Sequence, residues 1–200
     1  MKLYETVFSF IAGHDRGWAF TSSDLIKKFT RQEADSTLSY LLKKKKIRRI
    51  CRGMYDYPKY SDFLGQELSP DIDQVARAFA RKFNWRIEIS GDSALNVLGL
   101  STQIEGKYIY LCDGVDRVYD INGTTLRFKK TALKNIGFKH NESSFIVQAL
   151  KTLGKERITP EVIRKIRKQV KPDRRKIILA DTQSSTVWIY ETIKQICREG

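Results

Sequence analysis

The segment of residues 30–58 constrains the fold most, because it joins a helical pattern to a run of cations and a short strand pattern. Four lysines at 43–46 follow a predicted helix over residues 32–45, and residues 47–57 have the pattern of a hairpin that turns at Gly53. Pro58 ends the hairpin, since proline cannot donate to a strand ladder. A helix followed by a basic hairpin predicts a module that binds duplex DNA.

The residues before this segment supply the rest of such a module. Apolar side chains at helical spacing predict helices over residues 2–12 and 24–29, and residues 19–20 can form a short bridging strand. Three helices followed by a β-hairpin predict a winged helix-turn-helix over residues 1–60.

Positive charge is concentrated after the third helix, where seven of the ten residues from 43 to 52 are Lys or Arg. The whole chain carries a net charge of +14, which favours polyanionic partners such as DNA. Lysines at a helix C-terminus also suit the helix dipole and can simply be solvated. The adjoining hairpin pattern favours the DNA interpretation, because a hairpin of this kind places cations beside phosphates.

Two sets of residues are therefore candidates for DNA contacts. The polar face of the third helix is predicted to face the major groove through Arg31, Gln32, Ser36, Ser39, Tyr40 and Lys43. The end of this helix and the hairpin are predicted to hold phosphates or the adjacent minor groove through Lys44, Lys45, Lys46, Arg48, Arg49 and Arg52. Asp35 lies on the same face and can cap the helix start or accept from a cytosine amine.

The rest of the chain predicts a second domain over residues 71–200, after a linker over 61–70. A strongly amphipathic helix is predicted over 72–83, strands over 87–89 and 107–112, and a hairpin around Asn122-Gly123. Helical patterns dominate from residue 141 on, and a basic segment over 164–175 is predicted mainly to be solvated, with a flanking phosphate contact left open. The predicted fold class is α+β, with the winged helix-turn-helix followed by a mixed domain of a small antiparallel sheet and a helical C-terminal part.

Residues able to do chemistry give no catalytic pattern. Cys51, Cys112 and Cys197 are far apart, so we expect free thiols and no zinc site, and we expect no cofactor. A metal-dependent enzyme acting on nucleic acid would draw on Asp113, Asp116 or Asp120, but turn and hairpin roles explain these aspartates more simply. We therefore expect no enzyme. The chain has no signal-peptide pattern and no apolar run of about 20 residues, so we expect a cytoplasmic protein without membrane contact.

Several segments together resemble a known family. These are IRRICRGMYDYP at 47–58, LSPDI at 68–72, SGDSALNVLGLSTQ at 90–103 and KYIYLCDGVDRVYDINGTTLRFKKT at 107–131. The chain resembles AbiEi-type antitoxins of type IV toxin–antitoxin systems, in the branch long filed as a domain of unknown function. The resemblance extends from about residue 20 to past residue 190.

This resemblance implies a function beyond DNA binding. It implies that the N-terminal winged helix binds inverted repeats in its own promoter and represses it, and that the C-terminal domain carries antitoxin activity. It also implies that a nucleotidyltransferase-like toxin is countered without a stable complex. A stand-alone winged-helix regulator is the alternative, and a neighbouring toxin gene would distinguish the two.

Overall fold

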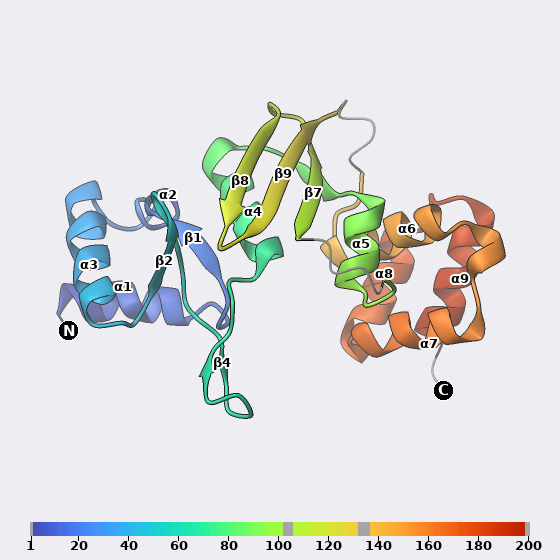
Figure 1. The fold of residues 1–200 in the computed structure, drawn as a ribbon, viewed down its shortest axis with the longest axis horizontal. Helices are drawn as coiled ribbons and strands as arrows, with labels where there is room; N and C mark the ends of the chain where they lie inside the picture. Colours follow the sequence, from blue (N-terminus) through green and yellow to red (C-terminus); the bar gives the residue numbers. More distant parts are fainter. Residues whose placement is uncertain (1, 102–105, 132–136, 199–200) are drawn as a thin grey trace. The chain divides into compact units, whose positions relative to one another are not determined.

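The computed structural model describes residues 2–101, 106–131 and 137–198 (Figure 1). Helices and strands are mixed throughout, which confirms the predicted α+β class. Two compact units divide the chain: residues through Trp85 together with Asp120–Gly123, and Arg86–Tyr119 with the chain from Thr124 on. Among the described residues, no helix is both long enough and apolar enough to span a bilayer.

The first unit combines three helices with a three-stranded sheet. Its first elements are α1 (Leu3–Ala12), β1 (Ala19–Thr21), α2 (Ser22–Leu25), α3 (Arg31–Lys43), β2 (Arg48–Cys51) and β3 (Met54–Asp56). The sheet has the order β1-β3-β2 and both of its pairs are antiparallel. The observed helix α2 is shorter than the helix predicted over 24–29 and begins earlier in the chain. The reason is that the Asp24 carboxylate accepts from the backbone N–H of Thr21 at 2.9 Å and so caps α2.

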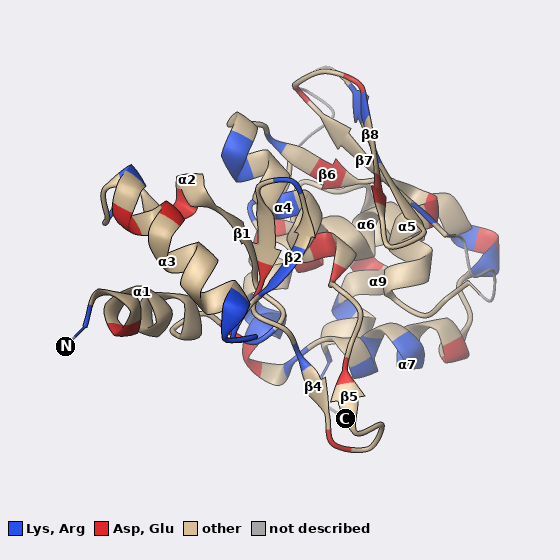
Figure 2. Ribbon diagram, turned by 60° about the vertical axis from the view of Figure 1, so that its left-hand side comes forward, with Lys and Arg blue, Asp and Glu red and all other residues tan. Residues whose placement is uncertain are grey.

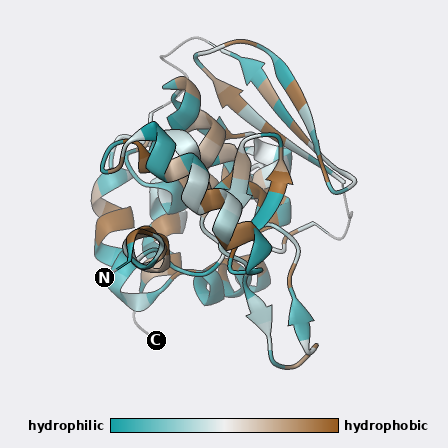
Figure 3. Cartoon of the chain, turned by 90° about the vertical axis from the view of Figure 1, so that its left-hand side faces the viewer, coloured by the Kyte–Doolittle hydropathy of each residue, from teal (hydrophilic) through white to brown (hydrophobic). Residues whose placement is uncertain are grey.

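The core of this unit lies between its helices and the sheet. Each helix contributes one apolar side, and hydrophilic and hydrophobic residues alternate along these helices in Figure 3. The buried side chains are Val7, Ile11, Phe20, Leu25, Ala34, Leu38, Leu41 and Ile47. The opposite side of α3 is thereby left facing solvent.

The predicted linker over 61–70 contains a small hairpin of β4 (Tyr60–Ser61) and β5 (Gln66–Glu67). It leads to α4 (Ile72–Phe83), whose N-terminus is capped by the Asp71 carboxylate. Helix α4 packs on β1, and Arg81 donates to the Asp24 carboxylate at 2.7 Å and to the Ala19 carbonyl at 2.7 Å. These contacts tie α4 to the first unit, so the compact units divide after Trp85 and not at 61–70.

Most of a four-stranded sheet of order β6-β7-β9-β8 lies in the second unit, and the last two residues of β8 belong to the first. The strands of this sheet are β6 (Ile87–Ile89), β7 (Lys107–Cys112), β8 (Arg117–Ile121) and β9 (Thr124–Lys130). Strands β6 and β7 are antiparallel as predicted, and Asn122-Gly123 connects β8 to β9 as predicted. The pair β7/β9 is parallel, so the predicted small antiparallel sheet is antiparallel only in part: the second strand of the hairpin lies beside β7, and β8 is the edge strand.

Helices complete the second unit. They are α5 (Gly91–Val97), α6 (Asn141–Leu153), η2 (Lys155–Arg157), α7 (Pro160–Gln169), η3 (Pro172–Arg174), α8 (Arg175–Asp181) and α9 (Val187–Cys197). Helix α5 lies against α6 so closely that a Cβ at Gly91 would lie 3.2 Å from the Gln148 carbonyl oxygen and would collide with Thr152. Ser93 accepts from the backbone N–H of Ile109 at 2.8 Å and joins α5 to β7. The segment SGDSALNVLGLSTQ therefore serves packing here, and its Thr102 and Gln103 lie outside the described residues.

Candidate nucleic-acid interface

Helix α3 begins with a reciprocal cap. The Thr30 hydroxyl oxygen accepts from the backbone N–H of Glu33 at 3.3 Å, and the Glu33 carboxylate accepts from the backbone N–H of Thr30 at 2.8 Å. The backbone hydrogen bond and then the side-chain hydrogen bond from Thr30 lower the pKa of Glu33. This cap fixes the first turn, from which the exposed side chains of Arg31 and Gln32 project.

The exposed side of α3 carries all six residues predicted to face the major groove. Two of them are already committed as donors: the Ser36 hydroxyl donates to the Glu33 carbonyl at 3.1 Å, and the Ser39 hydroxyl donates to the Asp35 carbonyl at 3.0 Å. These hydroxyls can still accept, so they suit a donor on a base edge better than a phosphate. Arg31 and Asp35 form an exposed ion pair at 3.8 Å, which contributes little to stability.

The end of α3 places a lysine where helices usually have glycine. The backbone N–H of Lys45 donates to the Leu42 carbonyl and that of Lys46 donates to the Leu41 carbonyl, both at 3.0 Å, and Lys45 has a φ of 53°. This is a Schellman ending, which favours glycine at the left-handed position. Lysine in this left-handed conformation costs more conformational energy than glycine would. Backbone stability therefore does not explain a lysine at this position.

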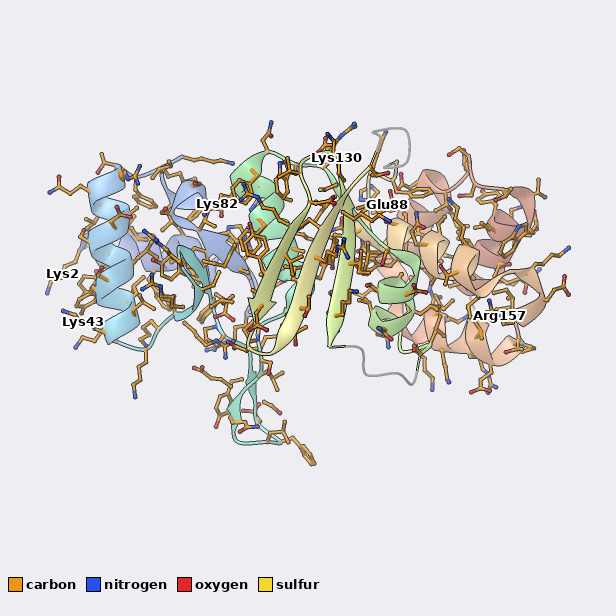
Figure 4. The ribbon with its side chains drawn as sticks, turned by 45° about the horizontal axis from the view of Figure 1, so that its top comes forward. Lys2, Lys43, Lys82, Glu88, Lys130 and Arg157 are labelled. Atoms are coloured by element: carbon orange, nitrogen blue, oxygen red, sulfur yellow. The ribbon has the colours of Figure 1, made fainter. Side chains whose placement is uncertain are left out.

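The basic hairpin is formed as predicted by β2 and β3, with Gly53 at a φ of 73° in the turn. Arg49 and Arg52 are exposed on it. The register shifts between Arg49 and Cys51, which marks a bulge in β2. In Figure 2 the ribbon is blue at the end of α3 and along β2, and Figure 4 places Lys43 at the end of α3.

Arg48 differs from the other predicted phosphate contacts. Its Nε and Nη2 donate to the Asp56 carboxylate at 3.1 and 2.6 Å, and its Nη1 donates to the Leu68 carbonyl at 3.0 Å. Asp56 is only 1% exposed, so this pair holds the hairpin to the chain that follows it. Contrary to the prediction that Arg48 holds a phosphate, its guanidinium is therefore used within the first unit.

The pairing of Arg48 with Asp56 was not predicted from the sequence. The signal was present: Met54 and Asp56 lie two residues apart on one strand, so an inward Met54 also turns Asp56 inward. Arg48 and Asp56 are register partners across β2 and β3, and a buried carboxylate needs such a partner. Burial raises the pKa of Asp56, and the Arg48 hydrogen bond acts in the opposite direction.

The remaining cations of the segment form no ion pair with a described residue, although Lys44 and Lys46 lie over aromatic rings. Within residues 2–101, 106–131 and 137–198, no ion pair involves Lys43, Lys44, Lys45, Lys46, Arg49 or Arg52. All six are exposed. They form a positive surface on one connected segment of the first unit, which we call the cationic ridge.

The three aspartates considered as metal ligands have local structural partners. Asp113 accepts from the backbone N–H of Arg86 at 2.8 Å, Asp116 from that of Lys130 at 2.5 Å, and Asp120 from that of Gly123 at 3.2 Å. No group of three or more His, Cys, Asp or Glu residues suited to a metal occurs in the described part of the chain. The three cysteines are free thiols, as predicted.

Comparison with known proteins places the chain in a family. No curated protein matches it. The crystal structure of the RV2827C protein from Mycobacterium tuberculosis is similar, with 13% sequence identity and a TM-score of 0.44, over 98% of this chain and 76% of that one. Residues 6–178 match the family of unknown function DUF6088, and the chain belongs to that family.

Proposed function

We propose that the first unit binds duplex DNA as a winged helix-turn-helix, with α3 in the major groove and the β2–β3 hairpin as the wing. The order α1-β1-α2-α3-β2-β3, with its three-stranded sheet, is the order of elements in that motif and supports the proposal. The first turn of a recognition helix reads base edges, and Arg31 and Gln32 occupy this turn. Arginine suits guanine and glutamine suits adenine.

The cationic ridge is the observation that carries this proposal. Six exposed cations without an ion pair in the described chain lie between the end of α3 and the turn of the hairpin. Duplex DNA offers rows of phosphates on both sides of a groove, which such a ridge can neutralise with release of counterions. A surface that served only solubility would more often intersperse charges of both signs.

We further propose that the protein is the antitoxin of a type IV toxin–antitoxin system and represses its own promoter at inverted repeats. This part rests on the sequence resemblance to AbiEi-type antitoxins. The second unit then carries the antitoxin activity against a nucleotidyltransferase-like toxin, without a stable complex. A stand-alone regulator would share the DNA-binding unit and lack the activity against a toxin.

DNA binding is tested by measuring the affinity of the full chain for promoter duplex over a series of salt concentrations. The double variant Arg49→Ala/Arg52→Ala should bind all sequences more weakly, with the salt slope reduced by about two units. The matched control Lys151→Ala/Lys168→Ala removes two exposed cations from the second unit and should leave the slope unchanged. An unchanged slope in the Arg49/Arg52 variant would overturn the assignment of the wing.

The antitoxin role predicts that a nucleotidyltransferase-like toxin is encoded beside this gene, and it is tested in cells that express that toxin. Co-expression of the protein should restore growth, and the Arg49→Ala/Arg52→Ala variant should restore growth while failing to repress the promoter. Repression without any rescue of growth would identify a stand-alone regulator.

A further inference from the structure

The hairpin β4–β5 carries an unusual apolar tip. It extends away from the helices of its unit (Figure 1), and at its tip Phe63 is 96% exposed and Leu64 is 54% exposed. The Ser61 hydroxyl accepts from the backbone N–H of Leu64 at 3.2 Å, which holds the turn. A hairpin with two residues in each strand is marginal in water on its own. Its exposed aromatic tip is therefore suited to contact with another molecule.

The charge around this tip indicates the kind of surface it would contact. Asp62 precedes Phe63, is exposed, and has no hydrogen bond or ion pair within the described residues. A carboxylate beside the phenyl ring disfavours insertion into DNA, because phosphates would repel it. The tip instead fits an apolar cavity that is bordered by lysine side chains.

The first unit itself provides such a hollow between α1 and α3. This cavity has a volume of about 370 Å³, and its apolar lining includes Tyr4, Phe8, Tyr40 and Leu41. Lys44, Lys46 and Glu5 also line it, so its charged groups are two cations and one carboxylate. The Lys44 ammonium lies 5.8 Å from the Tyr40 ring centroid, and the Lys46 ammonium lies 5.9 Å from that of Phe8. An apolar cavity of about 150 Å³ is enough for benzene, so this one has room for a phenyl ring and part of a neighbouring side chain.

We propose that a second copy of this chain inserts Phe63 into the cavity between α1 and α3, with Asp62 beside Lys44 and Lys46. Reciprocal exchange of two tips closes the assembly as a symmetric pair, in which each copy gives and receives the same contact. Tyr40, Lys44 and Lys46 also belong to the proposed DNA surface. Self-association and DNA binding therefore exclude each other, and this last consequence rests on the proposed function.

Self-association is measured by sedimentation velocity on the full chain without DNA. The wild type should form dimers in a concentration-dependent way, and Phe63→Ala should raise the dimer dissociation constant about 30-fold. The control Val118→Ala removes another exposed apolar side chain, which is 63% exposed, and should leave this constant unchanged. A wild type that stays monomeric up to about 1 mM, or a Phe63→Ala variant that dimerises normally, overturns the proposal.

A second variant tests the cavity without changing the tip. Ser9 lines the cavity and is exposed, so Ser9→Trp should fill it and prevent dimerisation. A mixture of Phe63→Ala and Ser9→Trp chains restores one tip and one cavity and should associate more strongly than either variant alone. A mixture no stronger than its components contradicts the insertion of tip into cavity.

DNA binding then separates the two proposals. At protein concentrations where the wild type dimerises, Phe63→Ala should bind promoter duplex more tightly than the wild type. Equal affinities would overturn the mutual exclusion. If neither protein binds DNA, the proposed function fails, while the sedimentation result still decides on self-association.

Discussion

Two basic stretches of this chain are similar in sequence but differ in how many of their cations have partners within the protein. Residues 43–52 have seven cations in ten positions, and residues 164–176 have eight in thirteen. In the second stretch, Arg167 donates to the carbonyls of Gln195 and Ile196 at 2.6 and 3.1 Å, and Arg174 pairs with Glu142 at 3.0 Å. In the first stretch, Arg48 is the one cation with such a partner among the described residues.

The difference follows from what surrounds each stretch. The second stretch runs through short helices whose neighbours offer carbonyl ends and carboxylates, which accept from arginine. The first stretch runs from a helix end into a hairpin turn, where the described carboxylates that pair with it, Asp56 and Glu67, both pair with Arg48. A cation is therefore available to a partner molecule when the topology leaves no acceptor within its reach.

The largest expected effect separates Arg48 from Arg49. Arg48→Ala should lower the free energy of unfolding by about 3 kcal/mol, because it leaves the buried Asp56 charge without a partner. Arg49→Ala, on the same strand, should change it by no more than about 0.5 kcal/mol. Urea denaturation of the two variants measures both. Similar losses of unfolding free energy in the two variants would contradict the view that Arg48 stabilises the fold and Arg49 does not.

The pH dependence of this loss sharpens the same comparison. Burial raises the pKa of Asp56, and removing Arg48 removes the interaction that lowers it. A folded-state pKa above the unfolded value favours folding at low pH, and this advantage is lost as pH rises through the folded pKa. The deficit of Arg48→Ala should therefore shrink as pH falls from about 7 to about 5, in denaturation curves recorded at each pH.

A smaller effect is expected in the second basic stretch. Arg167→Ala removes two hydrogen bonds to the end of α9 and should cost about 1 to 2 kcal/mol of unfolding free energy. Lys168→Ala removes the neighbouring exposed charge and should cost almost nothing. Neither variant should change the salt slope of DNA binding. A reduced slope in either would show that this stretch also contacts phosphates.

At the end of α3, one substitution should change stability and binding in opposite directions. Lys45→Gly should raise the free energy of unfolding by about 1 kcal/mol, because glycine adopts the left-handed conformation without strain. It should also reduce the salt slope of DNA binding by about one unit. Lys44→Gly is the control, since Lys44 has a φ of −82° and gains nothing from glycine. Weaker folding of Lys45→Gly would show that the lysine is favoured there for stability.

The smallest effect concerns the start of α3. The pKa of Glu33 is lowered by its hydrogen bonds from Thr30, so its contribution to stability is present above the unfolded pKa and is lost as pH falls through the folded pKa. Glu33→Gln keeps a side-chain acceptor for the cap without the charge. The variant should lose less stability than the wild type between about pH 5 and pH 3, as followed by thermal denaturation. Identical pH profiles would show that the charge of Glu33 does not act on the cap.

Most local elements could be predicted because their causes are local. Apolar spacing predicted α1, α3 and α4, and Asn122-Gly123 predicted the β8–β9 hairpin, since each depends on neighbours along the chain. The parallel pairing of β7 with β9 could not be predicted, because strand order depends on contacts between distant segments. The place of α4 in the first unit likewise depends on Arg81 reaching Asp24, 57 residues earlier.

The sequence by itself determined that cations gather after a capped helix and that glycine turns a basic hairpin, because charge and turn chemistry are properties of adjacent residues. Only the tertiary structure decided which of these cations remain available. Arg48 meets the buried Asp56 and holds the fold, whereas Arg49 and Arg52 meet no carboxylate in the described chain. The reason is that an ion pair needs two groups within a few ångströms, and that proximity is set by packing and not by order along the chain.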